Sequence, residues 1–107
     1  MDDMVCSCYN AIIGYHGKLK YPIKQCINKL GHALHDLNKK FERLSYSTEI
    51  AYICNMLGMK SPIIAQSMYI FKSGFVGGAV QPHTDNTFIH TKPMSCQGVW
   101  MAFDDAN

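Results

Sequence analysis

The stretch that most constrains this chain is a run of β-forming residues, Ile63 to Phe71, followed by a glycine-rich turn and then by Pro82-His83-Thr84-Asp85. In an extended backbone successive side chains point to opposite faces, so His83 and Asp85 are predicted to project from the same face. An imidazole and a carboxylate on one face are two of the three ligands in the facial triad that binds non-haem Fe(II). The third ligand would be a second histidine, and none stands at an obvious position.

A His-x-Asp pair occurs by chance in many proteins, and the competing interpretation is a solvated pair of loop residues. The context favours a metal site, because a β-run and glycines precede the pair and Pro82 restricts the backbone just before it. We therefore predict that His83 and Asp85 are metal ligands.

Length and composition limit the classes of function. A chain of 107 residues forms one small domain, and 48% hydrophobic with 17% charged residues is typical of a folded protein. The net charge of +2, without a basic stripe, argues against nucleic acid or a membrane as a partner. The sequence has no membrane-spanning stretch and no export signal, so we expect a cytoplasmic protein.

The odd number of cysteines and their scattered positions favour reduced thiols in a reducing compartment over disulfides or a zinc site. They are Cys6, Cys8, Cys26, Cys54 and Cys96.

Apolar residues recur at steps of three and four from residue 23 onward, which predicts an amphipathic helix beginning near Pro22. These residues are Ile27, Leu30, Leu34, Leu37, Phe41 and Leu44. Asn38 indicates a break before Phe41. Gly31 inside a helix would cost about 1 kcal/mol relative to Ala, so we expect another element to approach closely there.

A second helix is predicted over Thr48 to Leu57, with Ser47 as its N-cap and Gly58 just past its end. Strands are predicted over 63–72 and 98–103. Helices first and strands after them indicate an α+β fold in a single domain over 1–107. Its parts are an N-terminal extension with a turn or hairpin (1–22), a helical segment (23–58) and the strands with the His-x-Asp motif (63–107).

Other histidines give weaker signals. His32 and His35 would share a helix face and could bind zinc, but two ligands make no closed site, so a structural role is the favoured interpretation. His16 and His90 are interpreted as structural or exposed.

Four blocks of the sequence, in order, resemble the phytanoyl-CoA dioxygenase family. They are Ile27–His35, Gln66–Lys72, Gly77-Gly78 with Pro82–Asp85, and Gly98–Trp100. The branch called domain-containing protein is more similar than the peroxisomal hydroxylase itself. The resemblance implies an Fe(II)- and 2-oxoglutarate-dependent dioxygenase, with ascorbate as a reductant and an unidentified small-molecule substrate. It also implies a double-stranded β-helix (jelly roll), of which this chain would hold the N-terminal helices and the first strands.

The resemblance also assigns roles to individual residues. His83 and Asp85 would bind iron, and these two with Thr84 would border the cosubstrate 2-oxoglutarate. Lys29 would contact 2-oxoglutarate, and the same pocket would be lined by Met68 and Trp100. Without the resemblance, these last three would be interpreted as a solvated lysine, a core methionine and a core tryptophan.

The chain departs from the family pattern in one respect. The distal histidine ligand and the arginine that holds the far carboxylate of 2-oxoglutarate would lie well downstream of Trp100, and His90 is a poor substitute for the histidine. We therefore expect a truncated, incomplete domain whose turnover is weak or absent. The alternatives are an inactive binding module and, less favoured, a small zinc protein that uses His32, His35 and cysteines.

Overall fold

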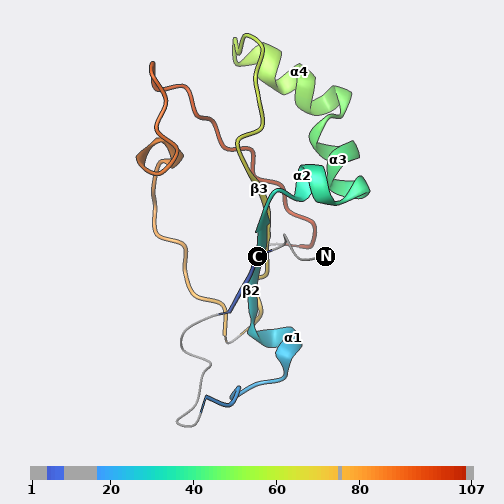
Figure 1. Ribbon diagram of the computed structural model, residues 1–107, viewed down its shortest axis with the longest axis vertical. Coiled ribbons are helices and arrows are strands. Elements are labelled where there is room, and N and C mark those ends of the chain that lie inside the picture. Colours follow the sequence, from blue (N-terminus) through green and yellow to red (C-terminus); the bar gives the residue numbers. More distant parts are fainter. Residues whose placement is uncertain (1–4, 9–16, 75, 106–107) are drawn as a thin grey trace.

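The computed structural model describes residues 5–8, 17–74 and 76–105. Short helices and a three-stranded antiparallel sheet make up the fold, which confirms the α+β prediction (Figure 1). The elements are β1 (Val5–Cys8), α1 (Ile23–Cys26), β2 (Ile27–His32), α2 (Leu34–Leu37), α3 (Lys39–Ser45), α4 (Thr48–Met56), β3 (Ser67–Ile70) and the 3₁₀ helix η2 (Asp85–Thr87).

The sheet has the order β1-β2-β3, so β2 pairs on both of its edges. Opposite Ile70 of β3 lies Lys29 of β2, and the pairs Leu30–Tyr69 and Gly31–Met68 follow. Because side chains alternate along a strand, Lys29 and Met68 share one face of the sheet, and Tyr69 belongs to the other.

The strand β2 corrects the sequence prediction, which placed Ile27–His32 within a helix. The helices in this region are α1, whose four residues directly precede β2, and α2 and α3, which follow β2. Hydrogen bonding to β1 and β3, which are distant in sequence, overrides the local three-four spacing of apolar residues. The expected close approach at Gly31 is confirmed, but inside the sheet: a Cβ there would lie 3.0 Å from the Cβ of Met68.

The break expected at Asn38 is confirmed. Asn38 ends α2 and caps α3, because its Oδ1 accepts hydrogen bonds from the backbone N–H groups of Lys40 (3.0 Å) and Phe41 (3.4 Å). This side chain lets two short helices meet at an angle.

The second predicted helix is confirmed as α4. Ser47 caps it by accepting from the backbone N–H of Ile50 at 3.4 Å, and Gly58 follows it with a φ of 73°. The pKa of Glu49 in the first turn is lowered, first by a hydrogen bond from its own backbone N–H and then by the side chains of Ser47 and Thr48.

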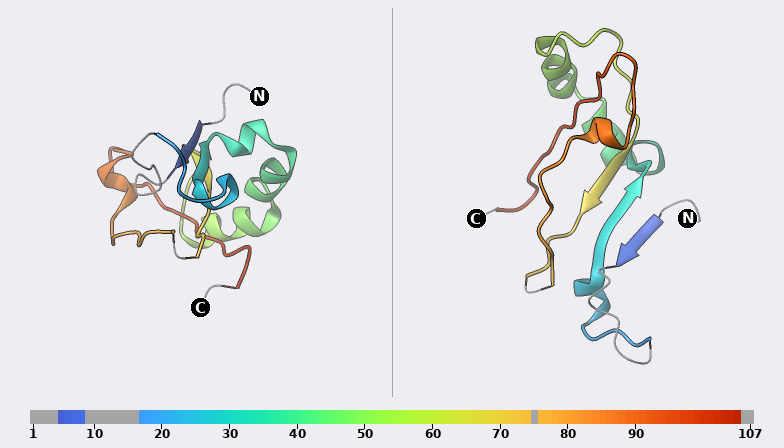
Figure 2. Two further views of the ribbon diagram at one scale, coloured as in Figure 1. Left: turned by 90° about the horizontal axis from the view of Figure 1, so that it is seen from below. Right: turned by 90° about the vertical axis from the view of Figure 1, so that its left-hand side faces the viewer.

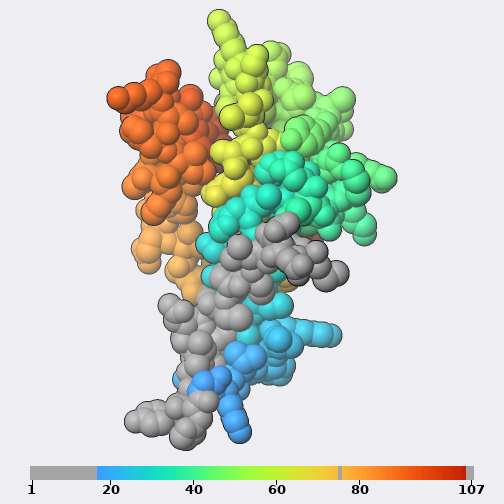
Figure 3. All heavy atoms as spheres, in the orientation of Figure 1, coloured from blue at the N-terminus to red at the C-terminus, as the bar shows by residue number. Residues whose placement is uncertain are grey.

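Helices and motif lie on opposite sides of the sheet. In Figure 1, α2, α3 and α4 are on the right and the segment that contains η2 is on the left. The right-hand view of Figure 2 shows the sheet from that left side, with α2, α3 and α4 behind it. The space-filling view gives the same arrangement, with the residues around η2 forming one flank of the molecule (Figure 3).

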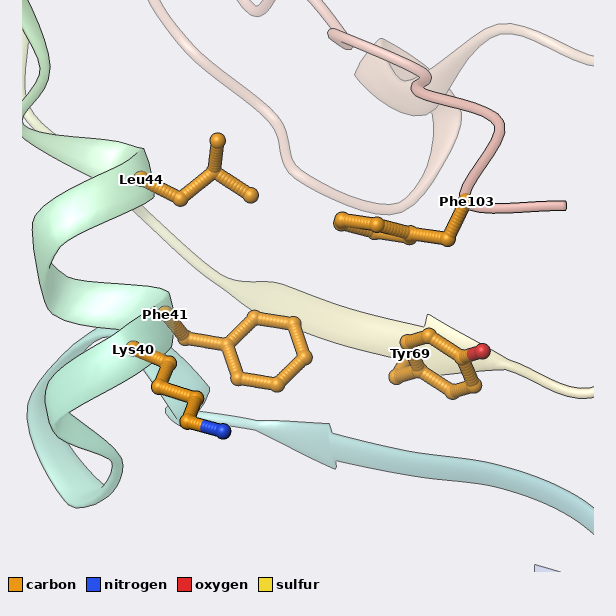
Figure 4. Close-up of a pocket in the computed structure, with 5 residues that line it drawn as sticks. All are labelled: Lys40, Phe41, Leu44, Tyr69 and Phe103. Atoms are coloured by element: carbon orange, nitrogen blue, oxygen red, sulfur yellow. The ribbon is translucent and has the colours of Figure 1, made fainter.

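Aromatic rings line the side of the sheet that faces the helices. The ring centroid of Tyr69 lies 6.2 Å from that of Phe41 in α3 and 5.7 Å from that of Phe103. A shallow pocket of about 250 Å³ opens between these rings (Figure 4). Since Tyr69 faces the helices, the alternation of side chains turns Lys29 and Met68 toward the side on which η2 lies.

Of the two predicted strands, one was too long and the other is not formed. Of residues 63–72 only Ser67–Ile70 pair as a strand, and residues 98–103 form none because they have no hydrogen-bonded neighbour strand within the described chain. The interpretation of Trp100 as a core residue was wrong, because its side chain is 75% exposed.

A jelly roll is not formed by the described residues.

Within the predicted N-terminal extension, Val5–Cys8 form β1, which pairs with β2. Most of the predicted turn or hairpin, at residues 9–16, lies outside the described residues. No helix within 5–8, 17–74 and 76–105 is long and apolar enough to cross a membrane.

A hydrogen-bonded pair joins α2 to β3. Ser67 Oγ accepts from the backbone N–H of His35 at 2.9 Å and makes a second hydrogen bond with Nδ1 of the His35 ring, 2.6 Å away. His35 is buried, which makes it the satisfied structural histidine that the sequence favoured.

We predict that Ser67→Ala lowers the free energy of unfolding by about 1–3 kcal/mol, because it leaves two polar groups of the buried His35 without their partner. Urea unfolding followed by circular dichroism measures this change. The control is Ser45→Ala in α3, whose side chain makes no hydrogen bond to another described residue, and we expect it to stay within about 0.5 kcal/mol. Equal effects of the two substitutions would contradict the prediction.

Candidate metal centre

His83 and Asp85 point to the same place. Thr84 between them has φ −118° and ψ 136°, an extended conformation, and Asp85 begins η2. Nε2 of His83 lies 3.6 Å from Oδ1 of Asp85. The side chains therefore converge as the alternation of an extended backbone predicts.

A backbone carbonyl fixes the orientation of the imidazole. Nδ1 of His83 lies 2.7 Å from the carbonyl oxygen of Gln81, and since a carbonyl only accepts, Nδ1 carries the proton and donates it. The other ring nitrogen, Nε2, is then on the side of Asp85. Histidines that bind metals commonly donate their other ring N–H in this way.

The pair fits one divalent cation. Two neighbouring ligands, each about 2.1 Å from an ion, lie about 3 Å apart, so a small closing movement of the 3.6 Å pair brings both within reach. The side chains of His83 and Asp85 are 48% and 41% exposed, which leaves room for further ligands on the ion. Among the residues that the structure describes, no third His, Cys, Asp or Glu completes a group with them.

One side chain, which we did not single out from the sequence, holds the next loop against η2. Asn86 accepts at Oδ1 from the backbone N–H of Cys96 (3.2 Å) and the hydroxyl of Thr91 (3.4 Å), and its Nδ2 donates to the carbonyl of Cys96 (3.3 Å). Thr91 in turn accepts from the backbone N–H of Ser95 at 2.8 Å. We call these four residues the Asn86 clamp.

Glycines precede and follow the motif, and Gly78 and Gly98 differ in their surroundings. A Cβ at Gly78 would have no heavy atom within 4 Å, whereas a Cβ at Gly98 would lie 2.6 Å from Oδ2 of Asp85. Gly98 thus borders the predicted metal ligand. In the sequence, Gly98 was noted only as part of the family-like block Gly98–Trp100, and nothing indicated this contact.

The predicted cosubstrate residues are divided between two places. Lys29 and Met68 are half-buried on the sheet face turned toward η2, and Thr84 lies between the two predicted ligands, its Oγ1 3.1 Å from that of Thr87. Trp100 is largely exposed, two residues beyond Gly98. No hydrogen bond or ion pair joins Lys29 or Met68 to the His83–Asp85 pair in the described part of the chain.

The zinc interpretation receives no support from the described residues. His32 is exposed in β2 while His35 is buried against Ser67, and His90 is exposed. Cys26, Cys54 and Cys96 are free thiols, as expected. His16 and the side chains of Cys6 and Cys8 lie outside the described residues.

A family model for phytanoyl-CoA dioxygenase (PhyH) matches residues 11–107. The chain belongs to the phytanoyl-CoA dioxygenase family. It is 46% identical over 93 residues to the phytanoyl-CoA dioxygenase of Arabidopsis thaliana, covering 87% of this chain and 33% of that protein. It is also 47% identical over 90 residues to a domain-containing protein 1 homolog of Dictyostelium discoideum, covering 84% of this chain and 32% of that protein.

A further relative is the phytanoyl-CoA dioxygenase domain-containing protein 1 of Danio rerio, 45% identical over 91 residues, or 84% of this chain and 31% of that protein. The resemblance found in the sequence blocks is therefore confirmed, as is the domain-containing branch. This chain spans about a third of the length of these curated relatives.

The turn that leads into the motif is closed by Lys72, whose Nζ donates to the carbonyl of Gly78 at 2.7 Å. We predict that Lys72→Met speeds amide hydrogen exchange of residues 77–80 several-fold but costs less than about 1 kcal/mol of stability, since the bond is exposed. Exchange measured by mass spectrometry tests this. The exposed Lys60, replaced by Met, is the control, and equal exchange in both variants would contradict the prediction.

Proposed function

We propose that this chain carries the iron-binding motif and part of the cosubstrate site of an Fe(II)- and 2-oxoglutarate-dependent dioxygenase. The observation that supports this best is the hydrogen bond from His83 to the Gln81 carbonyl, which leaves Nε2 facing Asp85 at 3.6 Å. Such a pair, in a member of the phytanoyl-CoA dioxygenase family, is what a facial Fe(II) site needs from two of its three protein ligands.

His83 and Asp85 would hold the ion, and the carboxylate of Asp85 would offset part of its charge. When bound, Fe(II) with 2-oxoglutarate would supply the oxidation of an organic substrate by dioxygen. The exposed sides of both ligands leave space for the cosubstrate.

Four further residues are proposed to border 2-oxoglutarate. The ammonium group of Lys29, on the sheet face turned toward the motif, would pair with one of its carboxylates. Apolar surface would come from Met68 on the same face and from Trp100, and Thr84 would border the site from between the ligands.

The proposal extends beyond the described residues. A third iron ligand and an arginine for the far carboxylate would come from outside this sequence, in a complete double-stranded β-helix. The organic substrate is a small molecule whose identity we do not assign. A cytoplasmic location stays a prediction.

We predict that the chain binds Mn(II), a spectroscopic substitute for Fe(II), and that His83→Ala or Asp85→Ala weakens this binding at least about tenfold, or ~1.4 kcal/mol. Titration followed by the electron paramagnetic resonance signal of free Mn(II) measures the affinity. His90→Ala is the matched control, because His90 is exposed and lies outside the pair. Equal binding by the wild type and both ligand variants would overturn the metal site.

We also predict that the 107-residue chain forms succinate from 2-oxoglutarate, with Fe(II) and ascorbate, far more slowly than a full-length relative. The reason is that the described residues supply only two ligands to the ion. Succinate measured by mass spectrometry decides this, and turnover close to that of the relative would refute it.

A further inference from the structure

The two oxygens of the Asp85 carboxylate have different surroundings. Oδ1 faces Nε2 of His83 at 3.6 Å. Oδ2 lies against the backbone of Gly98, where a Cβ would come within 2.6 Å, closer than such atoms approach each other. Any side chain at position 98 would therefore have to push the carboxylate away.

The backbone conformation does not explain a glycine at this position. Gly17 and Gly58 have positive φ values of 71° and 73°, in the left-handed region that favours glycine, whereas Gly98 lies outside that region. Alanine could adopt the backbone of Gly98, but its Cβ would require the Asp85 carboxylate to shift.

The Asn86 clamp holds the backbone just before Gly98. Asn86 directly follows Asp85 in η2, and its side chain binds both the N–H and the C=O of Cys96, two residues before Gly98. The same short helix thus begins with the predicted ligand and holds the loop that meets this ligand from the other side. Thr91 and Ser95 complete the clamp through a 2.8 Å hydrogen bond.

We propose that Gly98 and the Asn86 clamp are positioning elements for the metal site, because together they hold the Asp85 carboxylate with Oδ1 directed at His83. This inference rests on the proposed iron site. It adds residues that act on the metal only through Asp85, with no contact of their own to the ion.

Two pairs of variants test the inference in the full chain. Gly98→Ala is compared with Gly78→Ala, since a Cβ at position 78 meets no atom within 4 Å. Asn86→Ala is compared with Asn55→Ala in α4, where Asn55 is exposed. For each variant we measure Mn(II) affinity by paramagnetic resonance, the thermal midpoint, and amide exchange at Cys96 without metal.

We expect Gly98→Ala to weaken Mn(II) binding about tenfold, as the loss of an orienting neighbour of a metal ligand commonly does, while its thermal midpoint stays within about 2 °C. Asn86→Ala should also weaken binding, and it should speed exchange of the Cys96 amide. Both control variants should match the wild type in all three measurements.

The inference is overturned if the wild type binds Mn(II) and Gly98→Ala binds it equally well. It is also overturned if Gly98→Ala lowers the thermal midpoint by more than about 5 °C, because the fold would then need the glycine. A wild-type chain that binds no Mn(II) overturns the proposed function and this inference with it. Exchange of Cys96, measured without metal, reports separately whether the Asn86 clamp exists.

Discussion

Pairing of β2 on both of its edges is the constraint on which the rest of the structure depends. It places Leu30 opposite Tyr69 and Gly31 opposite Met68, and the missing side chain of Gly31 lets β3 approach. One face of the sheet is then covered by α2, α3 and the aromatic rings around Tyr69, while the other turns toward the His-x-Asp segment (Figure 2). The division of the molecule into a side packed with helices and a side that carries the His-x-Asp motif follows from this one strand.

Features determined by neighbouring residues were predictable from the sequence. The alternation of side chains predicted the convergence of His83 and Asp85, and capping rules predicted α4. The residue type of Asn38 indicated the break between α2 and α3. Features that depend on distant segments were not: β2 carries a helical spacing of apolar residues, and only its partners make it a strand. The contact between Gly98 and Asp85 was missed for the same reason, since thirteen positions separate the two residues.

The candidate site combines both kinds of feature. Its two predicted ligands and the carbonyl that orients the imidazole all lie within Gln81–Asp85, so five consecutive residues hold the essential geometry. The predicted partners of the cosubstrate, Lys29 and Met68, reach the same side of the molecule only through the sheet. In the proposed dioxygenase these two parts would form one site.

The segment from Asn86 to Phe103 passes from one side of the sheet to the other (Figure 1). Asn86 binds the backbone of Cys96 on the side of the His-x-Asp motif, and the ring of Phe103 lies 6.4 Å from that of Phe41 among the helices. Gly98 lies between these two contacts in the sequence. The residues on either side of it are therefore held on opposite sides of the sheet, one by hydrogen bonds and the other by aromatic packing.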